Sequence, residues 1–472
     1  MDTKVIEYLK SKQIKVIQED IEQKLETWRD WYKGKVETFH NYKVYQGKKK
    51  IAVERKSLGM AARACQRWAD LLLNEKVEIN ADDEYTEERL QDILHSVNFY
   101  VRANNLIEAA FAVGGGFFIQ YWDGEKTAQK YVLQEFMYPI TYDSGRLTEA
   151  AFSTRKHIDG KEYVYLETHL LDDNGEYVID NALLASDGGG LAEVSPQFYE
   201  QHNIIPKFET HSKAPLFQMV RPNVANRGNF NSPYGTSVFS GAIDILKVID
   251  TVYDSYYKEF LLGKKRIFVT DGVANINFDK STGETIDVFD PNDEVFYRLP
   301  ENENGAPITE SNLGLRVAEH DMALQTQLNC FSQACGFGSN GFKWDAGNVA
   351  TATQIISENS EMFRTLKKHE TLLSDTITAM VKGLLFIESK FGGDTKLKLD
   401  ADITVNFDDS IIEDTAEIKR QAMLEMNAGL IDDIEYYQTV FKMSEEQALQ
   451  YRDKIRGRAI PAEEEPEPEG IV

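Results

Sequence analysis

The chain has 472 residues, of which 42% are hydrophobic and 11% aromatic, so it is able to bury one large core or several smaller ones. This composition excludes disorder throughout. The formal net charge of −25 argues against a protein that grips nucleic acid over its whole surface, because Lys and Arg supply most of the non-specific affinity for phosphate. Any role with DNA would have to consist of weak contact or passage.

The sequence also argues against a membrane span, a disulfide framework and a zinc site. No stretch approaches the roughly 18 to 20 uninterrupted apolar residues of a membrane span, and the first residues lack the apolar run of a signal peptide. We therefore expect no membrane partner and a cytosol-like compartment. Cys65, Cys330 and Cys335 lack the short paired spacing of a zinc site and are odd in number, which argues against a disulfide framework.

The first third of the chain has the pattern of amphipathic helices. Ile6, Leu9 and Ile14 recur at roughly helical spacing. Trp28, Trp31 and Tyr32 follow in a charged surround.

From Phe99 to about Arg221 the pattern changes and predicts strands. Residues 117–119 form an apolar run, residues 163–165 lie in an alternating segment, and residues 173–175 form a turn sequence. We expect a mixed α+β domain here.

Two helices and a small strand-rich insert are predicted next. Turn and capping residues at 231–237 precede a long amphipathic helix from about Thr236 to Leu262. Residues 264–316 contain short β-like runs at 267–269 and 294–297. A second helix is predicted at about Val317 to Ala334, so the two helices would form an antiparallel stalk that carries a small β tip.

A glycine-rich segment, 336–341, is predicted to end the second helix and to begin a loop. Apolar spacing then predicts a helix from Thr353 to about Ser389, on the order of 50 Å long. A strand at 403–407 and two or three helices to about Arg458 follow. Residues 461–472 are too acidic and proline-rich to fold alone.

Motifs that would indicate an enzyme are incomplete. Gly114–Gly116 are not followed by the Gly-Lys-Ser/Thr of a phosphate-binding loop, and turn or close packing is the better interpretation. His369 and Glu370 begin like a zinc-protease pair, but Leu373 stands where the second ligand is needed, which favours a surface or interface histidine. Ser153 and Lys156 lack the partner motifs of acyl-transfer enzymes.

Two acidic pairs, Asp408 with Asp409 and Glu413 with Asp414, could hold divalent ions in a nuclease. Their predicted place at a strand-to-helix junction favours solvated capping acids instead. We therefore expect no catalytic residue, no bound metal and no cofactor.

The order of predicted elements resembles the portal proteins of tailed double-stranded DNA bacteriophages, particularly the siphophage type, over nearly the whole chain. Three stretches carry the resemblance in sequence. They are 232–239 leading into 244–250, 350–360 leading into 365–370, and 407–414.

The resemblance implies a portal-type α+β fold with an α/β wing, a long-helix stem, a small β-rich clip, a long spine helix and a helical crown. The implied segments are the wing at 1–232, stem helices at 233–263 and 317–335, the clip at 264–316, the tunnel loop at 336–352, the spine helix and a wing strand at 353–408, the crown at 409–460, and a disordered acidic tail at 461–472.

The resemblance also implies a function. Such proteins form a ring, a dodecamer, at one capsid vertex, and double-stranded DNA passes through it during packaging and ejection. Implied partners are the terminase large subunit, a head-completion or adaptor protein, scaffold and major capsid protein. The protein would be assembled in the host cytoplasm and reside in the virion.

Candidate DNA contacts follow from the same resemblance. In the implied tunnel loop they are Asn340, Phe342, Lys343, Trp344, Asp345 and Asn348. For Trp344 a loop anchor is an alternative to DNA contact. Lys264, Lys265 and Arg266, at the junction of stem and clip, are further candidates, although the end of a helix favours cations for dipole reasons alone.

Two other functions remain open at the level of sequence. The acidic pairs would suit a metal-dependent DNA-processing enzyme. Long helices with a β tip would equally suit a ring component of a phage tail or baseplate.

Overall fold

A computed structural model describes residues 2–46, 49–74, 77–263, 266–270, 277–278, 285–286, 296–299, 308–311, 314–339, 341–342, 352–407, 415–441, 443, 448–449 and 451–453. The chain divides into two compact units. The larger comprises residues 1–347 and 364–407, and the smaller comprises residues 348–363 and 408–472.

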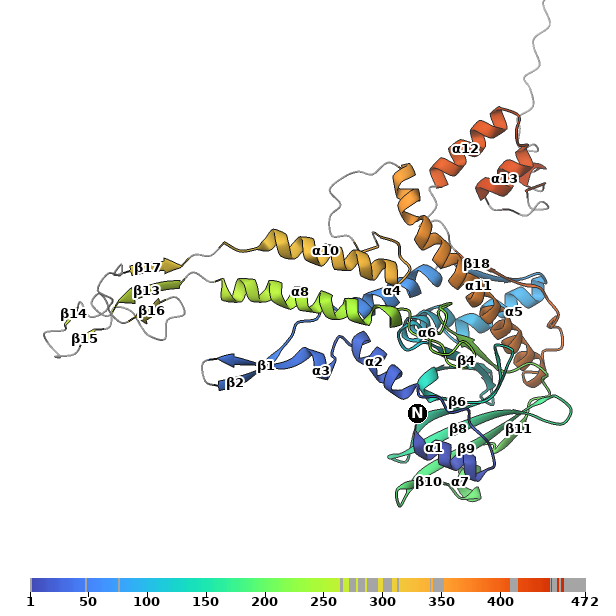
Figure 1. Ribbon diagram of the computed structural model, residues 1–472. Helices are drawn as coiled ribbons and strands as arrows, with labels where there is room; N and C mark the ends of the chain where they lie inside the picture. The colour runs from blue at the N-terminus through green and yellow to red at the C-terminus, as the bar shows by residue number, and fades with distance from the viewer. Residues whose placement is uncertain are drawn as a thin grey trace, which may run out of the picture. The chain divides into compact units, whose positions relative to one another are not determined.

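The N-terminal part is helical, as its pattern predicts. Helices α1 (Thr3–Ser11), α2 (Glu22–Tyr32) and α3 (Glu37–His40) are followed by the hairpin of β1 (Asn41–Gln46) and β2 (Lys49–Glu54) and by α4 (Met60–Leu72) (Figure 1). Asp2 caps α1, because its carboxylate accepts a hydrogen bond from the Lys4 amide at 3.0 Å. Ile14 lies beyond the end of α1.

The prediction of strands from Phe99 onward is wrong for its first part. After β3 (Glu78–Ala81) and α5 (Glu84–Ser96), helix α6 covers Phe99–Val113. Phe99, Ala103, Leu106 and Ala110 form its buried face, whereas Arg102 and Asn105 are exposed, and short apolar runs at the ends of such a helix resemble strands. Asn98 and Gly114, both with positive φ, border the helix.

Strands do follow from Gly116, in two antiparallel sheets. Strands β4 (Gly116–Trp122), β5 (Thr127–Leu133) and β12 (Phe217–Val220) pair in the order β12-β4-β5. The larger sheet has the order β10-β9-β8-β7-β6, with β11 also paired to β9. Its members are β6 (Met137–Asp143), β7 (Arg146–Ile158), β8 (Lys161–Leu171), β9 (Tyr177–Asp187), β10 (Gly190–Glu193) and β11 (Lys207–Glu209).

Helix α1 packs on the larger sheet. Val5 and Leu9 of α1 form one core cluster with Tyr138, Leu166 and Leu184 of the sheet. The short elements η1 (Gln134–Phe136) and α7 (Pro196–Gln201) connect strands of this region. The α+β interpretation of the sequence is thereby confirmed.

The stalk is formed by α8 (Ile243–Leu262) and α10 (Val317–Ala334), which lie side by side (Figure 1). The predicted start of the first helix at Thr236 is wrong, since residues before the turn η2 (Ser240–Ala242) are not helical. Two hydrogen bonds tie this segment to α6 instead: the Val238 amide and the Ser237 hydroxyl both donate to the Phe111 carbonyl oxygen. The predicted bounds of the second helix are confirmed.

A small sheet follows α8, in the order β16-β13-β17. Strand β13 (Arg266–Thr270) pairs in parallel with β16 (Phe296–Leu299) and antiparallel with β17 (Ile308–Ser311). Strands β14 (Asn277–Phe278) and β15 (Thr285–Ile286) form a separate antiparallel pair. The predicted strands at 267–269 and 296–297 are confirmed. Residues 294–295 lie outside the described part of the chain.

The predicted long helix is α11 (Ala352–Phe391). Its C-terminal half is a core element, with Ile377, Met380 and Leu384 fully buried. Strand β18 (Ile403–Asn406) then pairs antiparallel with β3, which lies in the first third of the chain.

The smaller unit contains α12 (Thr415–Asn427) and α13 (Asp433–Phe441). Aromatic rings of Tyr437, Phe441 and Tyr451 contact one another there. The acidic pairs near residues 408–414 and the tail 461–472 lie outside the described residues. Among the helices that the structure describes, none combines the length and the apolar character needed to cross a bilayer.

Candidate functional site

The stalk is held together by a buried apolar seam. Leu246 and Ile249 of α8 are buried, as are Leu324, Leu328 and Phe331 of α10. These buried residues lie toward the start of α8 and the end of α10, and the two helices contact each other.

Polar contacts join the stalk helices near the end that carries the small sheet. The Arg316 guanidinium donates to both carboxylate oxygens of Glu259, at 3.2 and 2.7 Å. This hydrogen-bonded pairing lowers the pKa of Glu259. The Ser255 Oγ atom of α8 and the His320 Nε2 atom of α10 lie 3.2 Å apart.

The beginning of the predicted tunnel loop is packed against α4. Gly336, with φ of +84°, ends α10, and the Phe337 ring stacks on Trp68 with centroids 4.4 Å apart. The Arg67 guanidinium donates to the Gly341 carbonyl oxygen and lies over the Phe337 ring. The first residues of the loop are therefore held against Arg67 and Trp68 of α4, and we call this contact region the seat of the loop.

Phe342 belongs to this seat. Its ring lies 5.8 Å from that of Phe331 and 5.2 Å from that of Phe337, between centroids. Arg67 also lies over the Phe342 ring. The structure thus brings one predicted channel residue into contact with the stalk and α4, and its contact with DNA stays a prediction.

Of the other residues predicted to contact DNA, the structure describes only Arg266. Arg266 is half-buried at the start of β13, where it is aligned with Ser311 of β17. The remaining candidates lie outside the described residues, and these are Lys264, Lys265, Asn340, Lys343, Trp344, Asp345 and Asn348.

His369 of α11 is a core residue, so the expectation of a surface or interface histidine is wrong. Its side chain is 2% exposed, and its Nδ1 accepts a hydrogen bond from the Asn223 amide at 2.9 Å. The ring meets Trp68 edge-on. Burial, with a smaller contribution from Lys368, lowers the pKa of His369 to about 3, so the imidazole is neutral at neutral pH.

Sequence reasoning missed the α4 residues Arg67 and Trp68. An Arg-Trp pair within an amphipathic helix carries no signal of its own, because its partners lie more than 260 residues further along the chain. The glycine-rich segment predicted where the loop begins, but not what it packs against.

The glycines at 114–116 serve close packing, as predicted. An added Cβ at Gly114 would lie 2.6 Å from the Gly235 carbonyl oxygen, and one at Gly235 would lie 1.9 Å from the Gly114 carbonyl oxygen. The end of α6 and the segment before α8 thus touch backbone to backbone. This contact sets the root of the stalk on the sheet domain. Among the described residues, no cluster of His, Cys, Asp and Glu is arranged to hold a metal ion.

The architecture just described is that of a helical stalk with a β tip, mounted on an α+β domain and followed by a long helix. Residues 11–461 match the model of a family described as "Phage portal protein, SPP1 Gp6-like". The chain therefore belongs to this family of phage portal proteins.

Two further comparisons are more limited. A search of curated proteins finds no match. Among solved structures, the chain is similar to one described as "Neck of native GTA particle computed with C12 symmetry", with 12% identity and a TM-score of 0.44. That likeness covers 80% of this chain and 89% of the other chain.

Proposed function

We propose that this portal protein is one subunit of a closed ring at a single capsid vertex, through which double-stranded DNA enters during packaging and leaves during ejection. Membership of the portal family over residues 11–461 is the observation that carries the proposal. The ring would reside in the virion after assembly in the host cytoplasm. It would act without catalysis or a cofactor.

The segments have separate tasks in this proposal. Helices α8 and α10 are the stem, and the sheet around β13 is the clip that would dock the terminase large subunit and later the head-completion or adaptor protein. The sheet domain with β18 is the wing, which would meet scaffold and major capsid protein. Helices α12 and α13 belong to the crown.

Passage of DNA requires a wall that does not hold it. Attraction summed over many phosphates in successive subunits would stall movement, and a chain with 77 acidic and 52 basic residues limits that attraction. Within the tunnel loop, Phe337 and Phe342 are held by ring contacts. Residues 343–350 would contact DNA while these two residues keep their contacts with α4 and α10.

A pair of variants tests the role of the loop. Shortening the segment Gly338–Gly347 should allow capsids to assemble but give empty or partly filled heads. Ile377→Asp should instead abolish folding or rings, because it puts a charge at a site with no exposed surface. Full-length DNA packaged and held at wild-type yield by loop-shortened particles would exclude residues 336–352 from the channel.

A further inference from the structure

Strands β1 and β2 form a two-stranded arm, residues 41–54, and no other strand in the described part of the chain pairs with it. They pair antiparallel without interruption from Asn41 opposite Glu54 to Gln46 opposite Lys49. Isolated hairpins of this kind are marginally stable in water. The arm therefore needs support from other elements, at its root and along its faces.

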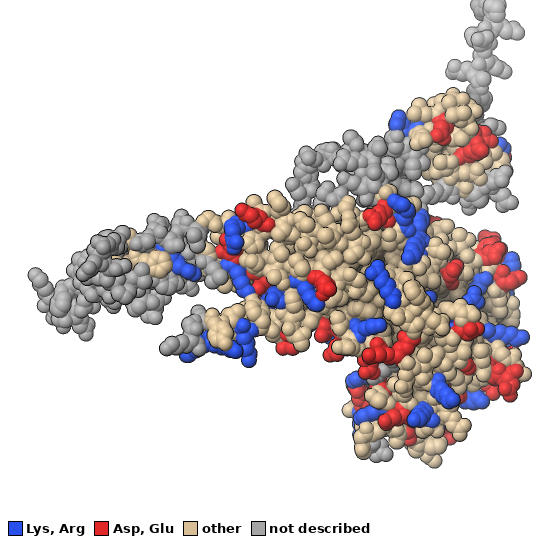
Figure 2. Space-filling view, viewed as in Figure 1, with Lys and Arg blue, Asp and Glu red and all other residues tan. Residues whose placement is uncertain are grey.

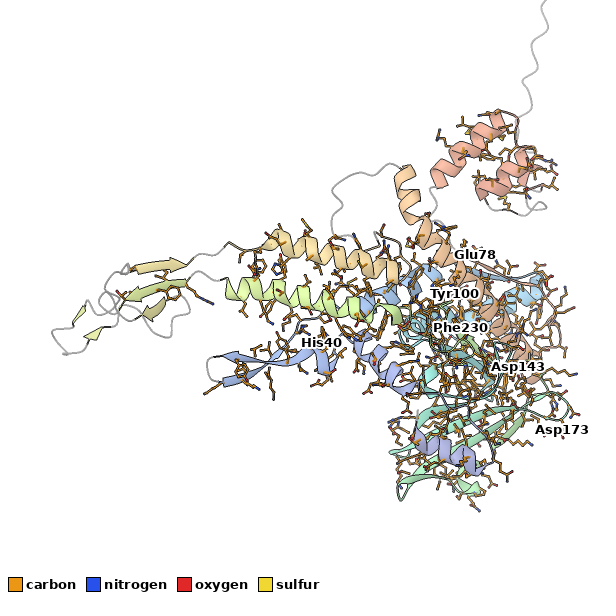
Figure 3. All side chains as sticks on the ribbon, in the orientation of Figure 1. His40, Glu78, Tyr100, Asp143, Asp173 and Phe230 are labelled. Carbon is orange, nitrogen blue, oxygen red and sulfur yellow. The ribbon has the colours of Figure 1, made fainter. Side chains whose placement is uncertain are left out.

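The root of the arm is fixed to the stem by a buried pair of residues. The Nε2 atom of His40 lies 3.0 Å from a carboxylate oxygen of Asp250 on α8, and both side chains are at most 3% exposed. The His40 Nδ1 accepts from the Val36 amide, so Nε2 carries the hydrogen and donates to Asp250. Figure 3 labels His40 where α3 lies beside α8.

A second carboxylate, one turn further along α8, holds the arm itself. Asp254 accepts hydrogen bonds from the Tyr42 hydroxyl at 3.2 Å, from the Lys56 amide at 3.2 Å and from the Lys258 ammonium at 2.6 Å. The Arg55 guanidinium covers the Tyr42 ring. Both strands are thus anchored to the stem at the end where β1 begins and β2 ends.

The arm is basic in an acidic chain. The arm and the two residues after it, 41–56 in all, include six Lys or Arg and a single Glu, whereas the whole chain has a net charge of −25. Lys43, Lys49 and Lys50 are exposed and form no ion pair within the described part of the chain. Figure 2 shows Lys and Arg side chains gathered on this hairpin.

Apolar side chains lie exposed among these cations. Tyr45 and Ile51 of the arm are 71% and 38% exposed, and they lie on opposite faces of the hairpin, because Tyr45 pairs with Lys50 and Ile51 pairs with Val44. Tyr257 and Leu261, on the face of α8 that continues beyond Asp254, are each 47% exposed, and the Lys56 ammonium lies over the Tyr257 ring. Exposed apolar side chains interspersed with charged ones are typical of a protein interface.

We propose that the arm, together with the adjoining face of α8, docks on a neighbouring copy of the chain. Without residues 41–56 each copy is still more acidic, so charge favours the contact. These exposed apolar side chains favour protein over DNA as the partner, because phosphates cannot cover Tyr45, Ile51 and Tyr257. Lysines along the strands oppose pairing with another strand, so the contact uses side chains.

This inference rests on the proposed ring and names a contact that would hold it closed. Rings are assembled from equal amounts of unlabelled and nitrogen-15-labelled chains, weighed by native mass spectrometry, and treated with a carbodiimide that joins lysine amines to carboxylates. We expect linked peptides from Lys43, Lys49 or Lys50 to Asp or Glu with mixed labels, which arise only between copies.

Charge reversal provides the second arm of the test. The variant Lys43→Glu/Lys49→Glu/Lys50→Glu should lower the yield of rings at least tenfold in physiological salt. Lys126→Glu/Lys161→Glu/Lys213→Glu changes charge equally at exposed sites elsewhere and should assemble normally.

The outcomes separate the inference from the proposed function. Absence of any ring overturns both. Rings without mixed-label links from the arm overturn the inference alone. Normal rings from the arm variant, together with loss of binding to a double-stranded DNA oligonucleotide, would assign the arm to DNA and also overturn it.

Discussion

At the scale of single residues, the contact between Gly114 and Gly235 decides how the stalk is mounted. The sequence identifies Gly114 as a turn or packing glycine, because no phosphate-binding motif follows it. It does not identify Gly235 as the partner, since the two positions are brought together only by the fold. Local patterns predict the type of a special residue more readily than the residue it meets.

Replacing Gly114 by Ala should destabilise the protein by more than replacing Gly124 does. Both glycines have φ near +100°, so both variants carry a backbone strain of about 1 to 3 kcal/mol. A Cβ at Gly114 also meets the Gly235 carbonyl oxygen at 2.6 Å, whereas one at Gly124 meets nothing within 4 Å. This crowding should add about 1 to 3 kcal/mol, measured by urea unfolding. Equal losses in the two variants would show that the close approach is unimportant.

Buried His369 should make stability depend on pH. Its pKa in the folded chain is about 3, below the ordinary value of 6.5, so the unfolded chain binds the extra proton first as the pH falls. The free energy of unfolding is therefore full above pH 6.5 and declines below it, by up to about 1.4 kcal/mol per pH unit for this group. In His369→Gln that part of the slope between pH 6 and pH 5 should vanish. An unchanged slope would contradict a neutral, buried imidazole.

At the scale of elements, periodicity predicted the exposed and half-exposed helices best. The bounds of α10 follow from one apolar face, and α11 follows from a long run of apolar positions three, four or seven apart. Helix α6 was missed although its buried residues recur three or four apart, because the short apolar runs at its two ends, 99–101 and 109–113, are also typical of strands. The start of α8 was placed too early because the turn and capping residues at 231–237 do not cap the helix: Ser237 donates to the Phe111 carbonyl oxygen instead.

The seam between α8 and α10 should dominate the stability of the stem. Leu328→Ala removes a side chain that is 1% exposed and should cost about 2 to 5 kcal/mol in the free energy of unfolding. Thr326→Ala, at an exposed position of the same helix, should cost less than about 0.5 kcal/mol. Chemical unfolding of both variants measures the contrast, and a small loss for Leu328→Ala would mean that the two helices separate easily.

At the scale of the whole molecule, the chain is acidic but carries one basic projection. The acidic surplus argues against tight DNA binding, and the basic residues of the arm, anchored by Asp250 and Asp254, form a local exception. Composition predicted the first property. The second needed the fold, because a lysine-rich hairpin in a sequence does not reveal that its root is fixed to a helix some 200 residues later.

The mass and image of the purified oligomer test the central claim most directly. Native mass spectrometry with negative-stain microscopy, at micromolar concentration and several salt concentrations, should give a single species near twelve times the 53.7 kDa chain mass, seen as a closed ring with an axial hole. A monomer under all of these conditions, or an open or solid assembly, would contradict the assignment of this chain to a DNA channel.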